Sequence, residues 1–128
     1  MPFSIDADVT FGPLDFDYLQ RLSDYVEGEG PVENVVWGLT IKARGERYGV
    51  AFIRDHGAFY TIDGYTLVSG RYALAVSKRA YEIAKACVPK NKPCVILFHP
   101  SRLNVKRLCA IVGGVEVYRD TDNLIMEV

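Results

Sequence analysis

The sequence predicts an α+β fold: a mixed, mostly antiparallel sheet with one parallel strand pair and the order β-α-β-β-β-α-β-α-β-β. Residues 58–68 are rich in aromatic and β-branched side chains, which is typical of a strand. Residues 72–87 place apolar side chains at helical spacing, and residues 94–98 form a short apolar run typical of a strand buried on both faces. Because a crossover that contains a helix joins parallel neighbours, strands 58–68 and 94–98 should lie side by side.

The N-terminal part predicts a strand followed by a helix. Apolar and polar residues alternate over residues 3–11, the pattern of a half-buried strand, and Gly12-Pro13 should end it. Apolar side chains then recur every fourth residue, so a helix should run from residue 14 to about residue 27. Asp15 and Asp17 fall in the first turn of this helix, where negative charge suits the helix dipole.

The middle of the chain predicts an antiparallel meander. Residues 34–43 and 47–54 have strand composition, and the turn residues Arg44-Gly45-Glu46 separate them. Asp55-His56-Gly57 forms another turn before strand 58–68. Three consecutive strands joined by short turns should therefore pair in sequence order.

The last 27 residues predict a helix and a closing pair of strands. The helix should cover about residues 102–112, and Gly113-Gly114 should stop it. Its apolar positions are Leu103, Leu108 and Ile111. Residues 115–119 and 124–128 have strand composition around a polar turn.

Length and composition are those of an ordinary globular protein. The chain has 128 residues, of which 49% are hydrophobic and 24% charged, so residues 1–128 should form a single domain with a core of its own. No apolar run approaches the roughly 20 residues that span a bilayer, and the N-terminus has no signal-peptide core. These patterns favour an intracellular, cytoplasmic protein without a membrane partner.

The cysteines indicate neither a disulfide framework nor a metal site. Their number is three and none has CxxC spacing, so we expect no structural zinc and no other metal. Cys87, Cys94 and Cys109 should be small buried hydrophobic residues.

The small net charge of −1 hides a marked asymmetry along the chain. Residues 1–36 contain eight acidic residues and one basic residue, whereas the stretch from Arg71 to Arg107 contains nine basic residues and one acidic residue, Glu82. The basic stretch would favour a polyanionic ligand. The other interpretation is a solvated helix surface, because lysine and arginine are usually exposed.

The order of elements and the C-terminal motif resemble the GCN5-related N-acetyltransferases, known as GNAT proteins, and more particularly small divergent members encoded by tailed bacteriophages. The closing stretch is the most specific: Pro100 to Val115 followed by Asp122-Asn-Leu-Ile-Met-Glu127 resembles the family's asparagine, helix, glycine and final strand with a Met–acid pair. The resemblance covers nearly the whole chain in topology. It implies acetyl-CoA as the acyl donor, an amine as the acceptor, and a location in the host cytoplasm or virion.

The resemblance also implies where acetyl-CoA would bind. Residues 70–87 occupy the place of the family's acyl-CoA helix, whose preceding loop reads Arg/Gln-x-x-Gly-x-Gly/Ala. Two registers each match this loop in part, and with the following asparagine they give the cofactor-binding candidates Leu67, Val68, Gly70, Arg71, Tyr72, Ala73 and Asn104. Neither register is complete, and the tyrosine that often serves as general acid in the following helix is missing.

The chemistry implied for a transferase needs a base for the amine and an acid for the departing thiolate. Asp63 is the candidate base, because Asp63-Gly64 predicts a bulge that would turn the carboxylate toward the parallel strands. The alternative is an exposed strand residue at a simple kink. Tyr118 is the candidate acid, with Tyr65 as another, and His99 should be a hydrogen-bonded structural histidine.

Three functional interpretations follow. The first is an acetyl-CoA-dependent N-acetyltransferase that transfers the acetyl group directly to an unidentified amine, with a homodimer as one assembly left open. The second is a GNAT-like binding or virion-associated module without catalysis, in which the incomplete loop reflects loss of the cofactor site. The third, a nucleic-acid-binding protein, is supported by the basic stretch, but the sequence shows no recognised nucleic-acid-binding motif.

Overall fold

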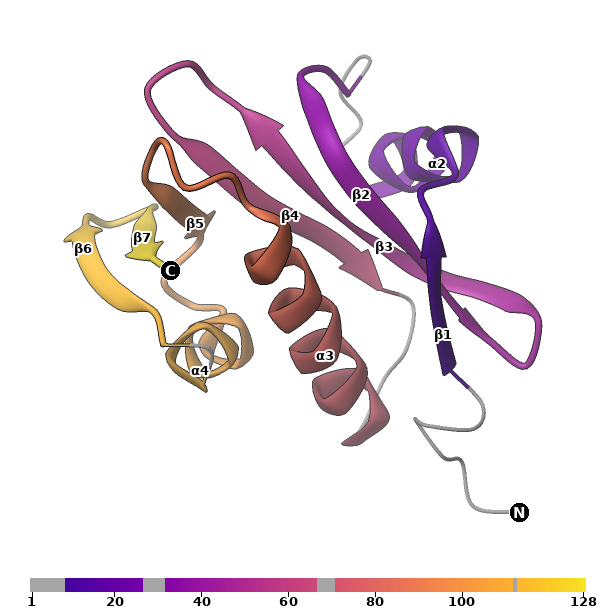
Figure 1. The fold of residues 1–128 in the computed structure, drawn as a ribbon. Helices are drawn as coiled ribbons and strands as arrows, with labels where there is room; N and C mark the ends of the chain where they lie inside the picture. Colours follow the sequence, from indigo (N-terminus) through magenta and orange to yellow (C-terminus); the bar gives the residue numbers. More distant parts are fainter. Residues whose placement is uncertain (1–8, 27–31, 67–70, 112) are drawn as a thin grey trace.

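The computed structural model describes residues 9–26, 32–66, 71–111 and 113–128. These form one seven-stranded sheet of order β1-β2-β3-β4-β5-β7-β6, in which only β4 and β5 are parallel neighbours (Figure 1). The elements are β1 (Val9–Pro13), α2 (Phe16–Val26), β2 (Val35–Ala43), β3 (Glu46–Asp55), β4 (Tyr60–Thr66), α3 (Arg71–Cys87), β5 (Cys94–Phe98), α4 (Leu103–Ile111), β6 (Val115–Arg119) and β7 (Leu124–Glu127). The predicted fold class, element order and single parallel pair are confirmed.

Strand β1 differs from its prediction at its end. Gly12 and Pro13 do not stop the strand, because they pair with Thr40 and Leu39 of β2. Proline is tolerated here since β1 is the outermost described strand on that side, where a missing N–H leaves no ladder bond unmade. Residues 3–8 of the predicted strand lie outside the described part of the chain.

Helix α2 begins at Phe16 because Asp15 caps it. The Asp15 carboxylate Oδ1 accepts the backbone N–H of Tyr18 at 3.1 Å, and this bond is the main cause of the lowered pKa of Asp15, with Arg47 adding to it. Asp15 is therefore the N-cap residue, whereas the sequence predicted that it lies in the first turn. Asp17 does lie in the first turn.

The meander is held in register by its turns. Arg44 and Gly45 link β2 to β3 with φ values of 52° and 83°, the left-handed conformations that a two-residue hairpin turn requires. In the next turn the Asp55 carboxylate accepts the N–H of Gly57 at 2.8 Å. Strand β4 starts at Tyr60, two residues later than predicted, because His56 N–H bonds to the carbonyl of Phe59 and closes the turn.

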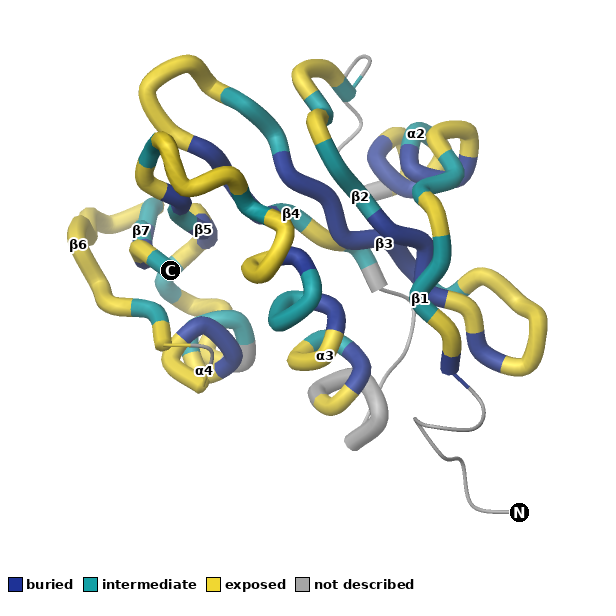
Figure 2. The backbone as a smooth tube through the Cα atoms, viewed as in Figure 1, coloured by how far each residue is buried: buried dark blue, intermediate teal, exposed yellow. Residues whose placement is uncertain are grey.

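Helices cover both faces of the sheet (Figure 1), and Figure 2 marks which residues of the strands and helices are buried. On one face, α2 contributes Leu19 and Leu22, which pack with Val50 and Phe52 of β3. On the opposite face, α3 and α4 pack over β2, β3, β4, β5 and β7. The buried residues there include Ala51, Ile53, Ile62, Val76, Ala80, Ala84, Ile96, Cys109, Leu124 and Met126. Helix α3 thus contributes to two neighbouring clusters of buried residues, with Val76 and Ala80 in one and Ala84 in the other.

Two predictions of burial are wrong, those for strand β5 and Cys87, and the apolar positions named for α4 are buried only in part. Strand β5 is buried on one face only, because Leu97 is 53% exposed on the face opposite α4. In α4, Leu103 and Ile111 are exposed, while Leu108 and Cys109 make the contact with the core. Cys87 is exposed at the end of α3, whereas Cys94 and Cys109 are buried as predicted.

Candidate active site

Strands β4 and β5 separate shortly after they meet. Their parallel register contains only Tyr60↔Cys94 and Thr61↔Val95, although β4 continues to Thr66 and β5 to Phe98. We call the diverging parts, residues 62–66 of β4 and 96–98 of β5, the β4–β5 splay. Ligands of open α/β sheets bind beyond the carboxyl ends of parallel strands. The β4–β5 splay is therefore the candidate ligand-binding site.

Side chains of β4 alternate between the two faces of the sheet at the splay. Ile62 packs with Ala84 of α3, while Asp63 is the cross-strand partner of Phe52 and so lies on the face that carries α2. A ligand approaching on the α2 face would therefore meet the Asp63 carboxylate.

The Asp63 carboxylate is held by two donors. Thr61 Oγ1 donates to Asp63 Oδ2 at 2.9 Å, and Arg54 Nε forms an ion pair with the same oxygen at 3.2 Å. His56 Nε2 lies 2.9 Å from Thr61 Oγ1 and extends the chain of polar contacts to the exposed turn after β3. The carboxylate is 27% exposed, so it is oriented by its neighbours and still open to solvent on one side.

The prediction of a bulge at Asp63-Gly64 is wrong. The β3–β4 register runs without a shift from Gly49↔Thr66 to Asp55↔Tyr60. Gly64 suits a different feature, the close approach of β3: a Cβ atom at this position would lie 3.1 Å from the carbonyl oxygen of Val50, a tight contact. Asp63 thus reaches the α2 face by ordinary strand alternation.

Tyr81 of α3 reaches the splay from the opposite face. Its hydroxyl lies 3.8 Å from the position that a Cβ of Gly64 would take. Burial raises the pKa of Tyr81, and the nearby Cys109 and Asp63 raise it further while Arg102 opposes them. This hydroxyl remains protonated across the ordinary pH range. No pattern in the sequence marks Tyr81 as a site residue, because an aromatic residue on the buried side of a helix is usually part of the core.

The cofactor candidates lie at the start of two helices. Arg71, Tyr72 and Ala73 form the first turn of α3, which follows β4, and Asn104 lies in the first turn of α4, which follows β5. Both helix N-termini therefore face the edge of the sheet where the parallel strands end, and their first N–H groups can bind an anion. Leu67, Val68 and Gly70 lie outside the described residues.

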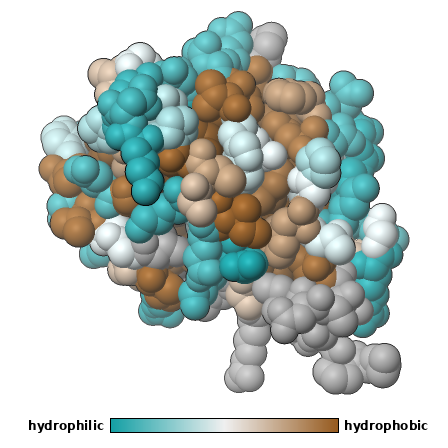
Figure 3. Space-filling view, in the orientation of Figure 1, coloured by the Kyte–Doolittle hydropathy of each residue, from teal (hydrophilic) through white to brown (hydrophobic). Residues whose placement is uncertain are grey.

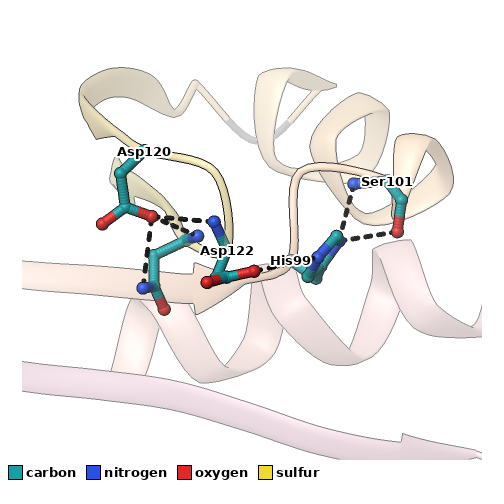
Figure 4. Close-up of polar contacts among 5 residues, drawn as sticks. His99, Ser101, Asp120 and Asp122 are labelled. Carbon is teal, nitrogen blue, oxygen red and sulfur yellow. Dashed lines mark hydrogen bonds and ion pairs between the residues drawn. The ribbon is translucent and has the colours of Figure 1, made fainter.

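His99 and Ser101 form a second polar group just beyond β5 (Figure 4). His99 Nδ1 lies 2.7 Å from Ser101 Oγ and accepts the Ser101 backbone N–H at 3.1 Å, while Nε2 lies 4.0 Å from Asp122 Oδ1. An Nδ1 that accepts places the proton of a neutral ring on Nε2, toward Asp122. The histidine is thus hydrogen-bonded within its own loop, as the sequence predicted.

Tyr118 does not lie beside Asp63. It belongs to β6, and β5 and β7 stand between β6 and β4 in the sheet. Its hydroxyl donates to Asp120 Oδ2 at 2.9 Å, a bond that raises the pKa of Tyr118 and lowers that of Asp120. Asp120 also accepts the backbone N–H groups of Asp122 and Asn123, so this network organises the β6–β7 turn.

A separate open cavity of about 580 Å³ lies at the far end of the sheet. Asp15, Tyr18, Lys42, Gly45, Glu46 and Arg47 line it. Asp15 and Arg47 are joined across it by an ion pair of 2.7 Å, and Arg47 stacks over the Tyr18 ring. Asp15 and Arg47 thus neutralise each other in this cavity, which contains none of the residues at the splay.

Within the described ranges, no group of three or more His, Cys, Asp and Glu side chains could hold a metal ion. None of the helices there is both long and apolar enough to cross a membrane.

Several solved structures with this arrangement are described as acetyltransferases. The protein yncA from Salmonella typhimurium, solved with its cofactor acetyl-CoA, superposes with a TM-score of 0.68 over 94% of this chain and 93% of its own, at 13% identity. The chain has the GNAT fold. Spermidine N-acetyltransferase from Vibrio cholerae, in complex with CoA and spermine, shares the GNAT fold at a TM-score of 0.66, 12% identity and 95% coverage of both chains.

An acetyltransferase from Agrobacterium tumefaciens matches the GNAT fold of this chain over all of its residues and 94% of its own, with a TM-score of 0.60 and 17% identity. As a sequence, the chain matches no family model and no curated protein. The similarity to GNAT proteins therefore lies in the fold, which places Asp63, Tyr81 and the N-termini of α3 and α4 around the splay.

Proposed function

We propose that this protein is an acetyl-CoA-dependent N-acetyltransferase that transfers the acetyl group directly to an amine. The observation that carries the proposal is the β4–β5 splay, where Asp63 lies on one face and the Tyr81 hydroxyl on the other. The fold shared with a protein solved with acetyl-CoA and with an enzyme solved with CoA and spermine supports it. Acetyl-CoA would supply an activated acetyl group as a thioester.

The cofactor would bind at the N-terminus of α3. The first backbone N–H groups of a helix have no partner within the helix and carry partial positive charge, which suits a diphosphate. We assign Leu67, Val68, Gly70, Arg71, Tyr72 and Ala73 to this contact, with Asn104 at the start of α4. The basic stretch from Arg71 to Arg107 adds a favourable field.

The acceptor would be a cationic amine that arrives on the α2 face. The N-terminal 36 residues contain eight acidic side chains and one basic, and α2 exposes Asp17 and Asp24 on that face. The basic helices α3 and α4 lie on the other face. This separation of charge would bring an anionic donor and a cationic acceptor to opposite faces of the same strands.

Asp63 would accept a proton from the amine, because its carboxylate is already fixed by Thr61 and Arg54 and partly open to solvent. Tyr81 would donate a proton to the departing thiolate from the α3 face. Tyr118, the acid suggested by the sequence, remains the competing candidate.

A thermal shift with acetyl-CoA tests the binding part of the proposal, since a ligand that binds the folded state raises its melting temperature. Incubation with acetyl-CoA and a panel of polyamines, followed by mass measurement of the products, tests the transfer. A melting temperature that rises without any acetylated amine would favour the binding module, and no rise at saturating acetyl-CoA would contradict the proposal.

Charge reversal at the start of α3 should weaken acetyl-CoA binding. We expect Arg71→Glu to lower the affinity about tenfold or more, because it adds negative charge beside a bound diphosphate. Isothermal titration with acetyl-CoA measures this. Arg21→Glu, which makes the same charge change on α2, should leave the affinity within about twofold; equal losses in both would mean that only net charge matters and that the site is misplaced.

Removal of the Tyr81 hydroxyl should slow turnover. We expect Tyr81→Phe to lower kcat about a hundredfold with little change in acetyl-CoA affinity, since a general acid acts only as the thiolate leaves. Steady-state kinetics of Tyr81→Phe and Tyr118→Phe separate the two candidate acids. A larger loss of kcat in Tyr118→Phe would assign the role to Tyr118.

The cysteines should take no part in transfer. Burial raises the pKa of both Cys94 and Cys109 to about 11, so neither is a thiolate near neutral pH. We expect Cys109→Ala to retain its single-turnover rate, and acid-quenched wild-type protein to show no added acetyl mass. An acetylated Cys109 that disappears in the variant would establish a covalent route instead.

A further inference from the structure

Arg54 and Asp63 form an ion pair that uses only part of each side chain. Arg54 Nε lies 3.2 Å from Asp63 Oδ2, and the Thr61 hydroxyl donates to the same oxygen at 2.9 Å. Within the described part of the chain, no residue forms a hydrogen bond or an ion pair with Asp63 Oδ1 or with the two Nη groups of Arg54. The two side chains are 35% and 27% exposed. The pair therefore keeps one carboxylate oxygen and two nitrogen donors for a ligand.

The β3–β4 register places both charged side chains on the face of the sheet that carries α2. Asp63 lies opposite Phe52, and Arg54 comes two residues later in β3 on the same face, so the two charged residues are diagonal neighbours. Val35, the neighbour of Arg54 on β2, packs against the buried cluster of α2 and Phe52. Figure 3 views the molecule with α3 in front, where hydrophobic residues are exposed between hydrophilic ones. A ligand at Arg54 and Asp63 therefore leaves that side to the acyl donor.

An ion pair with both partners partly free is complementary to a zwitterion. An amine with a single ammonium group would bind Asp63 but would also meet the positive guanidinium of Arg54, which repels it. A ligand with a carboxylate next to its ammonium presents the opposite charge to each partner. The guanidinium of Arg54 has a second edge, formed by its two Nη atoms, that can bind a carboxylate through two parallel N–H bonds. An α-amino acid carries both groups on one carbon atom, which matches two side chains already in contact.

We propose that Arg54 and Asp63 bind a free α-amino acid, by its carboxylate and its ammonium respectively, and that this amino acid is the acetyl acceptor. The inference rests on the proposed N-acetyltransferase function and narrows its acceptor. The ammonium loses one proton to Asp63 Oδ1, and the neutral nitrogen attacks the thioester carbonyl. The N–C bond forms and the C–S bond breaks, the thiolate takes a proton from Tyr81, and the second proton of the nitrogen restores that hydroxyl. The product is an N-acetyl amino acid.

Matched acceptors test the role of the carboxylate. Each common amino acid is compared with its amide and with the amine that lacks the carboxylate, for example leucine with leucinamide and isopentylamine. We expect kcat/KM for the preferred amino acid to exceed the values for its amide and its amine by about tenfold or more, because only the amino acid makes the charge-assisted contact with Arg54. The amide also represents the N-terminus of a peptide.

Two substitutions of Arg54 separate recognition of the carboxylate from support of Asp63. Arg54→Lys keeps the charge and loses the planar edge, and Arg54→Gln loses both. Each should raise KM for the amino acid about tenfold or more without raising KM for isopentylamine. If Arg54 only held Asp63 in place, kcat would fall for both acceptors alike. Arg47→Gln removes a guanidinium from the same strand outside the splay and should leave both KM values unchanged.

Equal kcat/KM for amino acids and their amides, transfer only to amines without a carboxylate, or an amino-acid preference that persists in Arg54→Gln would each overturn the proposal. Failure of the proposed function gives a different result, namely no acetylated product from any acceptor. Isothermal titration with the amino acids then decides: binding to the wild type that is lost in Arg54→Gln supports the amino-acid site without the transferase activity. The absence of such binding would overturn both.

Discussion

An Asp63→Asn variant should lose about 10²–10⁴-fold in kcat and keep its affinity for acetyl-CoA. The amide has nearly the shape of the carboxylate, and its oxygen can still accept the Thr61 hydroxyl that lies 2.9 Å from Asp63 Oδ2. It cannot take a proton from an amine. Because the residue lies on the α2 face, away from the helix N-terminus proposed for the cofactor, donor binding should be unaffected. Steady-state kinetics with isothermal titration measure both quantities.

Two further variants help to interpret a loss of kcat in Asp63→Asn. Thr61→Val keeps the carboxylate and removes one donor that orients it, so it should lower kcat less than Asp63→Asn does. His99→Gln tests the other basic side chain at the carboxyl ends of the parallel strands. An undiminished rate in Asp63→Asn excludes Asp63 as the base, and a larger loss in His99→Gln would move that role to His99.

Elements of the fold that depend on local sequence could be predicted, since side-chain periodicity reports which face of a strand or helix is buried. The change from strand to helix pattern after residue 68 predicted α3, and the helical crossover predicted that β4 and β5 are parallel neighbours. Periodicity does not say whether a helix covers the second face of a strand. The exposure of Leu97 on β5 therefore could not be predicted from its apolar run.

The candidate site was predictable only in part, because its contacts join residues distant in sequence. Asp63 could be singled out by its place in the strand before α3, but its partner Arg54 depends on the register of the β3–β4 hairpin. Gly64 suggested a bulge, whereas the structure uses it for the close approach of the Val50 carbonyl. The same kind of spatial contact brings Tyr81 to the splay, and no motif in the sequence marks it.

A Leu124→Ala variant should lose about 2–5 kcal/mol in the free energy of unfolding, because it removes a fully buried side chain and leaves a cavity. Leu124 has 0% exposure, pairs with Phe98 of β5, and packs in the cluster that includes Cys109 and Met126. Small domains have about 5–15 kcal/mol of total stability, so this loss is a large share of it. Urea denaturation followed by circular dichroism measures the change.

The matched control is the same substitution at an exposed leucine. Leu103 begins α4 and is 65% exposed, so Leu103→Ala should change the free energy of unfolding by no more than about 0.5 kcal/mol. Both variants remove the same atoms, and the difference between them therefore reports burial alone. A similar loss at both positions would contradict the assignment of Leu124 to the core and, with it, the packing of β7 beneath α4 that keeps β5 in place beside the splay.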